Sequence, residues 1–286
     1  MVLYIGNMNY FERAKFFRTK KRLGQNFLIN GEVIQDIIDE ANIQPEDTVV
    51  EIGPGVGFVT EQLVKYAKEV IAIELDEEAI KELEKLNAPN LKIIHADILK
   101  TDLSSLCEGS IKVVANIPYY ITSPIIAHLL GEVDDLNNKN RAKITDIILM
   151  VQQEVAQRMC ANENSQGKQY GLLTILSQFW ADVEMLRIVG RKCFYPAPKV
   201  TSALVKLSVR QKPLLDLTDY SHFRKTVRAG FAQRRKNIKN CLLNGGFLKD
   251  VVIKSLSELG IDENTRGEKL SIETFGKLSE LLIKNG

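Results

Sequence analysis

The sequence has few cysteines, no long apolar run and almost no net charge. Its four cysteines lie far apart and form no C-x-x-C pair, so neither a zinc site nor a disulfide framework is predicted, and we expect no metal. No apolar stretch approaches the length that a membrane span requires. The first residues lack a basic start, a sustained apolar run and a small-residue cleavage site. We therefore expect a cytoplasmic protein without a membrane partner.

The net charge of +2, from 38 basic and 36 acidic residues, does not identify a partner, so the distribution of charge has to. Two stretches are basic: Arg13 to Arg22, and Arg224 to Lys239, which contains no acidic residue. Contact with a polyanion such as RNA is one interpretation, and a solvated helix face is the other. The second stretch is thus a candidate polyanion-binding surface, with Arg224, Arg228, Arg234, Arg235 and Lys236 as the predicted contacts if the partner is RNA.

The chain of 286 residues, 45% of them hydrophobic, can bury a large core and still form a second, smaller domain. Over residues 25–209, short β-branched runs alternate with amphipathic segments, which is typical of a Rossmann-like α/β fold whose parallel sheet has helices on both faces. The expected strands are Thr48–Ile52, Val70–Glu74, Leu91–His95, Lys112–Ala115 and Thr145–Val151, and the expected helices are Gly57–Tyr66, Glu77–Leu86, Pro124–Leu130 and Gln152–Cys160.

The strand pattern stops after Val209, and the remaining sequence predicts helices interrupted at glycines. Turn-forming and charged residues at 131–143 predict an exposed connection within the first fold. We therefore expect a basic N-terminal extension (1–24), a Rossmann-like domain (25–210) and a small, all-helical RNA-binding domain (211–286).

The first expected strand leads directly into a loop that contains Gly53, Gly55 and Gly57. Glycines at such a junction let the backbone turn sharply and approach a ligand closely. The spacing G-x-G-x-G is not the usual G-x-G-x-x-G of nicotinamide sites and favours S-adenosylmethionine, which has no pyrophosphate. A tight turn without a ligand would be the alternative if the loop stood alone.

Two carboxylates follow the next strands, and both are expected at the same edge of the sheet. Glu74 ends the second strand, where it can accept hydrogen bonds from a ribose diol, and Asp97 follows the third, where it can bind an adenine amine. A solvated strand end or a helix cap is the alternative for each residue taken singly. With the glycine loop, the two carboxylates predict one nucleoside site.

The fourth strand is followed by Asn116, Ile117, Pro118 and Tyr119. An adenine amine is a poor nucleophile, because its lone pair is delocalised into the ring. The Asn116 side-chain oxygen and the Ile117 carbonyl can accept hydrogen bonds from that amine and favour its pyramidal transition state, while Tyr119 can stack on the ring. An Asn-capped turn is the alternative. The position after strand four favours a catalytic tetrad for methyl transfer.

A second aromatic motif, residues 194–202, lies late in the same domain. Its prolines stiffen a loop, and Phe194 could form the other face of a slot for an extruded base. A structural loop with a buried aromatic is the other interpretation, and the residues alone leave both open.

These features together resemble the small-subunit (16S) ribosomal RNA adenine N6-dimethyltransferases, the KsgA/RsmA dimethyladenosine transferase family. The resemblance runs from Lys20 to the C-terminus and rests on the motifs KKRLGQNFL (20–28), EIGPGVG (51–57), NIPYYITSPI (116–125), QQEVAQRM (152–159), FYPAPKVTSALV (194–205) and RGEKLS (266–271). Ile117 stands where family members often have leucine, and because its carbonyl does the work we expect activity to be kept.

The resemblance implies a monomeric enzyme that uses S-adenosyl-L-methionine and transfers two methyl groups to each of two adjacent adenosines near the 3′ end of small-subunit RNA. It implies action late in assembly, on the pre-30S particle. The implied catalytic residues are Asn116, Ile117, Pro118, Tyr119 and Phe194, and the implied cofactor contacts are Asn26, Leu28, Glu51, Gly53, Gly55, Gly57, Glu74, Asp97 and Asn116.

Three other functions remain as hypotheses. The erythromycin-resistance methylases share the tetrad but modify large-subunit RNA; LGQNFL, the long helical C-terminal region and RGEKLS resemble the small-subunit branch instead. A non-catalytic assembly factor could use the same RNA-binding surface. DNA adenine methylation fits the tetrad chemistry, but the C-terminal region has no recognisable DNA-reading motif.

Overall fold

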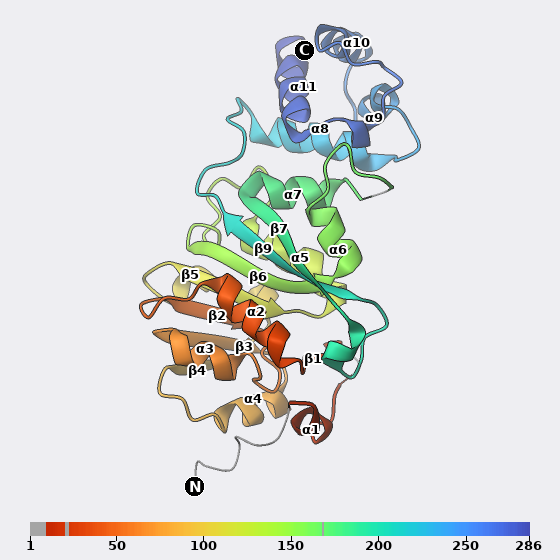
Figure 1. Ribbon diagram of the computed structural model, residues 1–286. Helices are drawn as coiled ribbons and strands as arrows, with labels where there is room; N and C mark the ends of the chain where they lie inside the picture. Colours follow the sequence, from red (N-terminus) through yellow and green to blue (C-terminus); the bar gives the residue numbers. More distant parts are fainter. Residues whose placement is uncertain (1–9, 21–22, 168) are drawn as a thin grey trace. The chain divides into compact units, whose positions relative to one another are not determined.

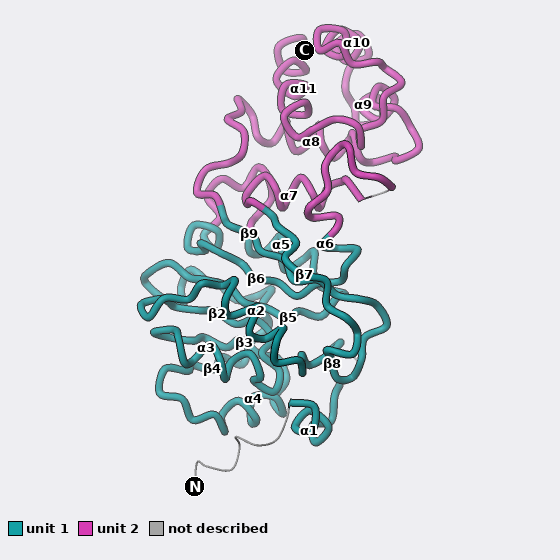
Figure 2. Tube along the Cα trace, in the orientation of Figure 1, with its two compact units in different colours: residues 1–129, 139–156, 183–209 teal, residues 130–138, 157–182, 210–286 magenta. Residues whose placement is uncertain are grey.

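The computed structural model describes residues 10–20, 23–167 and 169–286 (Figure 1). Within them the chain forms two compact units (Figure 2). Unit 1 comprises the described part of residues 1–129, with 139–156 and 183–209; unit 2 comprises 130–138, 157–182 and 210–286. Unit 2 thus takes in two segments from the middle of the chain besides the C-terminal region. The division into a 1–24 extension and domains at 25–210 and 211–286 stays a prediction.

Unit 1 is built on a seven-stranded sheet with the strand order β4-β3-β2-β5-β6-β9-β7. Its first five strands in sequence pair in parallel, as predicted, but β9 runs antiparallel to β6, so the sheet is mixed. A separate antiparallel pair joins β1 to β8. The strands are β1 (Phe27–Leu28), β2 (Thr48–Ile52), β3 (Glu69–Glu74), β4 (Leu91–His95), β5 (Ile111–Asn116), β6 (Ile144–Gln152), β7 (Ala181–Val189), β8 (Phe194–Tyr195) and β9 (Ser202–Val209).

The helices expected between these strands are present, with shifted ends. The expected helix at Gly57–Tyr66 begins at Thr60, because Gly57 has φ +84° and belongs to the preceding loop. The helices are α1 (Tyr10–Lys15), α2 (Gly31–Ala41), α3 (Thr60–Tyr66), α4 (Glu77–Glu84), α5 (Thr122–Leu130), α6 (Gln153–Met159), α7 (Leu172–Trp180), α8 (Tyr220–Ala232), α9 (Ile238–Asn244), α10 (Lys249–Glu258) and α11 (Ile272–Lys284).

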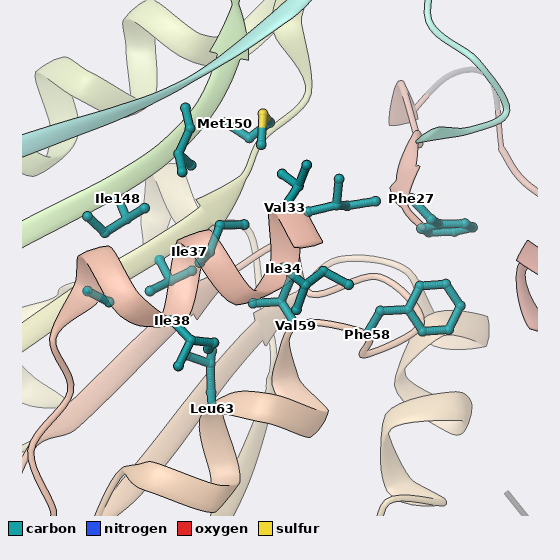
Figure 3. Close-up of a cluster of buried hydrophobic side chains, with 14 of the residues drawn as sticks. Phe27, Val33, Ile34, Ile37, Ile38, Phe58, Val59, Leu63, Ile148 and Met150 are labelled. Carbon is teal, nitrogen blue, oxygen red and sulfur yellow. The ribbon is translucent and has the colours of Figure 1, made fainter. Parts of the chain in front are cut away.

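One face of the sheet is covered by α2 and α3 through a buried apolar cluster (Figure 3). Helix α2 places its apolar residues three and four positions apart on this face, where they meet every second residue of the strands. Its N-terminus is fixed by Asn30, whose side chain accepts a hydrogen bond from the Val33 N–H at 3.0 Å. The labelled members in Figure 3 are Phe27, Val33, Ile34, Ile37, Ile38, Phe58, Val59, Leu63, Ile148 and Met150.

The strand order reverses beside β2, which lies between β3 and β5. Chain connections leave this point in opposite directions, so α3 and α5 fall on opposite faces of the sheet (Figure 1). A crevice is left at the carboxyl ends of the strands, which is where ligands bind in open α/β sheets. The fold therefore places the ends of β2, β3, β4 and β5 around one point.

The interval 131–143 is not wholly exposed, contrary to the expectation. Asn140 within it is only 7% exposed. Its side chain accepts a hydrogen bond from the Leu103 N–H at 2.9 Å and donates one to the His128 carbonyl at 3.1 Å. A polar residue in a turn-rich stretch can thus be buried when its amide bridges two backbone segments.

Unit 2 is helical in its C-terminal part. Helix α8 contacts α7, α9 and α11, and α10 contacts α9 and α11. The rings of Phe179 and Phe223 stack at 5.3 Å between centroids, and Phe223 and Phe275 are fully buried. The predicted helical character of residues 211–286 agrees with these elements.

Candidate functional site: a nucleoside pocket at the carboxyl end of the sheet

A pocket lies in the crevice where the strand order reverses. It holds about 940 Å³ of space between atoms, with its open mouth included, and small-molecule sites are concave spaces of this kind. Residues 23–28, the glycine loop and the ends of β3, β4 and β5 form its wall. The predicted residues that line it are Asn26, Leu28, Glu51, Gly53, Gly55, Glu74, Asp97, Asn116 and Pro118.

Two glycines of the loop shape the pocket and the third does not line it. Gly53 and Gly55 have φ of +67° and +58°, which disfavour other residues. A Cβ atom on Gly55 would lie 2.7 Å from Cε1 of the Phe27 ring, so the ring can cover the loop only if this residue is glycine. Gly57 instead faces Leu83 of α4, 2.9 Å from where its Cβ would lie. Its contact with a cofactor stays a prediction, and its packing against α4 is an observation.

The Glu74 carboxylate braces the glycine loop from the end of β3. It accepts hydrogen bonds from the backbone N–H of Gly55 at 2.9 Å and from those of Leu75 and Asp76 at 2.8 Å each. Burial raises the pKa of Glu74 above its ordinary value, and the three backbone donors oppose that rise. Oε1 accepts the N–H groups of Leu75 and Asp76, whereas Oε2 accepts only that of Gly55 and keeps a second lone pair, so the predicted ribose contact remains chemically open at Oε2.

Glu51, at the base of the pocket, is buried with one close polar partner. The Thr60 hydroxyl donates to its carboxyl oxygen at 2.6 Å. Burial raises the pKa of Glu51 to about 8, the hydrogen bond from Thr60 opposes the rise, and the negative charge of Glu74 adds to it. A pKa of about 8 leaves Glu51 mostly protonated at neutral pH, and a cationic ligand group beside it would favour the ionised form.

Replacing Glu51 by glutamine should stabilise the protein at alkaline pH and have little effect at acid pH. The pKa of Glu51 is raised from 4.5 to about 8. Ionisation of Glu51 therefore lowers the free energy of unfolding of the wild type increasingly as the pH rises between these values, by about 5 kcal/mol at most. Glutamine stays neutral and can still accept from Thr60. Thermal midpoints of wild type and Glu51→Gln at pH 4.5 and pH 9 measure the effect; an equal difference at both pH values would contradict it.

Asp97 has a structural role that the sequence left as an alternative. Its side chain accepts a hydrogen bond from the Leu99 N–H at 3.0 Å and so caps the short 3-10 helix that follows β4. The same residue lines the pocket. Capping and ligand binding are compatible, because a carboxylate can accept several hydrogen bonds. Its contact with an adenine amine stays a prediction.

The side-chain amide of Asn116 is oriented by the N-terminal segment. Its Nδ2 donates to the Asn26 carbonyl at 3.0 Å, and the Asn26 side chain donates in turn to the Gly24 carbonyl at 2.9 Å. Since the nitrogen of Asn116 is engaged in this way, Oδ1 is the atom that can accept a hydrogen bond from a substrate amine. This hydrogen bond joins the end of β5 to residues 23–28, and both segments line the pocket.

Three residues of the predicted catalytic set do not line this pocket. The Tyr119 hydroxyl hydrogen-bonds with Ser202 at 2.6 Å, and burial raises the pKa of Tyr119 although this hydrogen bond opposes the rise. Ile117 is 2% exposed. Phe194 is also 2% exposed and pairs with Leu28 in the β1–β8 ladder, which makes it part of the core. Their catalytic roles stay predictions.

Several pocket residues were not singled out from the sequence. Gln25 and Phe27 lie beside Asn26 and Leu28 and line the same wall. Tyr120 also lines the pocket and is 63% exposed, whereas its neighbour Tyr119 is tied to β9. The conspicuous motifs at 20–28 and 116–125 were the available signal, but they do not tell which of two adjacent aromatics faces the ligand.

The predicted RNA contacts in α8 are engaged within unit 2. Arg224 forms ion pairs with Glu132 at 3.3 Å and Asp134 at 3.2 Å, and Arg228 pairs with Glu132 at 3.2 Å. These two arginines are therefore partly neutralised by acids that lie about ninety residues earlier. Contact of Arg224 and Arg228 with RNA stays a prediction, and the acids that pair with them reduce the positive charge that they can offer to phosphate.

The other predicted basic contacts, Arg234, Arg235 and Lys236, are exposed. In the N-terminal basic stretch, Arg13 pairs with Glu61, Lys15 with Glu12 and Lys20 with Asp76. Lys21 and Arg22 lie outside the described residues. Among the described residues of the two basic stretches, Arg235 and Lys236 therefore present exposed positive charge.

Residues 16–284 match the sequence model of a family described as ribosomal RNA adenine dimethylase. The chain belongs to this family. The match spans both units and includes the glycine loop, the residues after β5 and the helical C-terminal region. The predicted relationship is thereby confirmed.

Curated members of this family resemble the chain over nearly its whole length. The ribosomal RNA small subunit methyltransferase A of Clostridium botulinum (strain Loch Maree) is 43% identical over 272 residues, which is 93% of this chain and 94% of that protein. The protein of the same name from Bacillus mycoides is 43% identical over 279 residues, or 93% and 92% of the two chains.

Solved structures of a dimethyladenosine transferase and of an rRNA methyltransferase share the fold. A dimethyladenosine transferase from Plasmodium falciparum has a TM-score of 0.71 at 30% identity and covers 87% of this chain and 94% of its own. The 23S rRNA methyltransferase ErmE has a TM-score of 0.71 at 28% identity, with 90% and 100% covered. The predicted Rossmann-like methyltransferase sheet and helical C-terminal region are therefore confirmed.

As a member of the ribosomal RNA adenine dimethylase family, the chain is a methyltransferase, and S-adenosyl-L-methionine is its cofactor. The pocket fits that molecule chemically. Three carboxyl groups, on Glu51, Glu74 and Asp97, surround a space whose glycine loop leaves room for a ligand. A cationic molecule with ribose hydroxyls and an adenine amine offers the donors that such acids accept.

No helix within the described residues is both long and apolar enough to span a membrane.

Proposed function

We propose that this chain dimethylates the N6 amines of two adjacent adenosines near the 3′ end of small-subunit (16S) ribosomal RNA. The single observation that carries the proposal is the Asn116 amide: its nitrogen is held by the Asn26 carbonyl, and its oxygen is thereby left to accept a hydrogen bond at the wall of the pocket. Adenine N6 chemistry needs an acceptor of this kind beside the methyl donor.

The chain's residues activate the amine by binding it. The Asn116 side-chain oxygen and the Ile117 carbonyl accept hydrogen bonds from the two N–H groups, which localises the nitrogen lone pair and favours the pyramidal amine. Pro118 restricts the backbone directly after the Ile117 carbonyl, and Tyr119 and Phe194 are proposed to flank the extruded ring. Bound S-adenosylmethionine supplies a methyl group on positively charged sulfur, so that no strong base is required and positioning contributes much of the rate.

The proposed cofactor contacts divide by chemistry. Glu74 would accept from the ribose hydroxyls, Asp97 from the adenine amine, and Glu51 would face the ammonium end. Asn26 and Leu28 close the pocket from the N-terminal side together with the glycine loop. This arrangement excludes water from the transfer site on the side of residues 23–28.

A small-subunit substrate is supported by the degree of similarity. The chain is 43% identical to proteins named small subunit methyltransferase A and 28% identical to the 23S enzyme ErmE, with high coverage in both comparisons. We further propose that the chain acts as a monomer in the cytoplasm, on RNA within the pre-30S particle.

The assay that tests this function compares labelled methyl transfer to immature small subunits, large-subunit RNA and duplex DNA. We expect incorporation into small subunits alone, with two dimethylated adjacent adenosines located by mass spectrometry. Incorporation into large-subunit RNA would instead support the erythromycin-resistance activity. A lack of transfer to all three, with tight binding to small subunits, would support a non-catalytic assembly factor.

The exposed cations Arg235 and Lys236, which lie between α8 and α9, should contribute a salt-dependent part of the affinity for RNA. Replacing Arg235 and Lys236 by alanine removes two exposed charges, and the slope of log affinity against log salt should flatten by about 1 to 2. Lys85→Ala is the matched control, because Lys85 is an exposed cation outside the predicted RNA contacts and is paired with Glu82. Filter binding to small-subunit RNA at several salt concentrations measures the slopes, and an unaltered slope in the double variant would mean that these residues contact no phosphate.

A further inference from the structure

Asp76 lies where the end of β3 meets the N-terminal segment of the pocket. Its side chain has no exposed surface, although it is the first residue before an exposed helix turn. Three groups donate to its carboxylate: the Glu78 N–H at 3.1 Å, the Gln25 side-chain amide at 2.7 Å and the Lys20 ammonium. The first bond caps α4, and the other two fix Gln25, which lines the pocket, and Lys20, which precedes the pocket wall.

Gln25 connects this carboxylate to the catalytic end of the pocket. Its Nε2 donates to Asp76 and its Oε1 accepts from the Lys20 backbone N–H at 2.7 Å, so both ends of the amide are held. The next residue is Asn26, whose carbonyl accepts the hydrogen bond from Asn116 at 3.0 Å. Two hydrogen bonds, linked covalently from the Gln25 side chain through the backbone to the Asn26 carbonyl, thus join Asp76 to the amide of Asn116.

We propose that Asp76 is a positioning residue that acts through Gln25 and the Asn26 carbonyl to orient the Asn116 amide for catalysis. This inference rests on the proposed function, in which Asn116 accepts a hydrogen bond from the substrate amine. A carbonyl that shifts by a fraction of an ångström would turn the amide, and small misplacements of reacting groups cost large factors in rate. Asp76 itself does not touch the substrate.

The electrostatics of Asp76 suit this role. Burial raises its pKa, and the hydrogen bonds from Lys20 and Gln25 more than offset that effect, so the net pKa lies below the ordinary value. The carboxylate is therefore ionised throughout the neutral range and can accept from all its donors at once. An amide in its place has only one acceptor oxygen for these donors.

Two single variants and their combination separate positioning from general stability. Asp76→Asn keeps the cap on α4, because asparagine is also a good N-cap. The hydrogen bond from the Gln25 amide is lost, however, because the NH₂ group of asparagine then faces the NH₂ group of Gln25. Gln25→Glu places a second carboxylate beside Asp76. The double variant Asp76→Asn with Gln25→Glu reverses the polarity of the pair and restores its hydrogen bond, with Lys20 still able to balance the charge.

Each single variant should lower the single-turnover rate by about 10- to 100-fold at saturating S-adenosylmethionine and small subunits. The double variant should recover to within a few-fold of wild type, which is the signature of a direct coupling. Glu77→Gln is the control, because it removes the same charge from the same exposed turn of α4 and should leave the rate unchanged. Unchanged rates in both single variants, or a double variant no better than the singles, would overturn the proposal.

A second measurement does not depend on the RNA substrate. The side-chain amide signals of Asn116 in a ¹⁵N–¹H spectrum, assigned by their loss in Asn116→Asp, should shift and exchange faster in Asp76→Asn but not in Glu77→Gln. Unshifted signals would overturn the relay. If the signals shift as expected while wild type fails to methylate small subunits, the relay stands and the proposed function fails.

Discussion

Replacing Asn116 by alanine is expected to lower the rate of methyl transfer by about 10²- to 10³-fold or more, the range seen when one preorganised hydrogen-bonding group is removed from an active site. Alanine removes the acceptor for the substrate amine and also the bond to the Asn26 carbonyl. S-adenosylmethionine should still bind, because the glycine loop, Glu74 and Asp97 are untouched. Single-turnover transfer of labelled methyl groups and calorimetric donor binding measure the two properties separately.

The Asn116→Asp variant distinguishes the two roles of the side chain. Aspartate keeps an oxygen that can accept from an amine, but it turns a carboxylate toward the Asn26 carbonyl, which has no proton to offer. We therefore expect a loss of rate in this variant as well, accompanied by weaker attachment of residues 23–28. An alanine variant that turns over at the wild-type rate with its fold intact would remove Asn116 from the mechanism.

The features that could be predicted from the sequence are those set by neighbouring residues. The glycine loop requires left-handed backbone at Gly53 and Gly55, and such a requirement is visible in the residue types themselves. The approach of Glu74 and Asp97 to Asn116 followed from a general property of parallel sheets, whose strand ends meet at one edge. Local pattern and a topological rule were sufficient for these residues.

Other features depend on partners that are distant in the sequence. The basic stretch in α8 indicated free cations, yet Arg224 and Arg228 pair with Glu132 and Asp134. The charge that reaches solvent depends on where these acids fold, which composition does not contain. The exposed Arg235 and Lys236 keep the simple electrostatic interpretation.

Long-range packing also explains two further features. Phe194 pairs with Leu28 and is buried in the core, whereas its proposed place beside the substrate stays a prediction. The mixed sheet has the same origin: the run at 202–209 is as apolar as a parallel strand, and only its pairing with β6 reveals the antiparallel direction. Long-range pairing of this kind leaves no local signature.

The second large effect is expected at Glu74, whose carboxylate holds the loop as well as facing the ligand. Glu74→Ala leaves the backbone N–H groups of Gly55, Leu75 and Asp76 without their acceptor. Hydrogen bonds to a charged group contribute about 1.5–3 kcal/mol each to stability. We therefore expect the affinity for S-adenosylmethionine to fall by about 100-fold or more and the thermal midpoint to fall by several degrees.

Calorimetric titration with S-adenosylmethionine and thermal unfolding measure the two effects of the Glu74 variant. Glu74→Gln should lie between alanine and wild type, because its single oxygen can serve some of the three donors but carries no charge. Glu69→Ala, at the opposite end of the same strand, is the control and should leave the affinity for S-adenosylmethionine unchanged. If Glu74→Ala binds S-adenosylmethionine as tightly as wild type, the loop keeps its shape without the carboxylate, and the ribose contact proposed for Glu74 contributes little to binding.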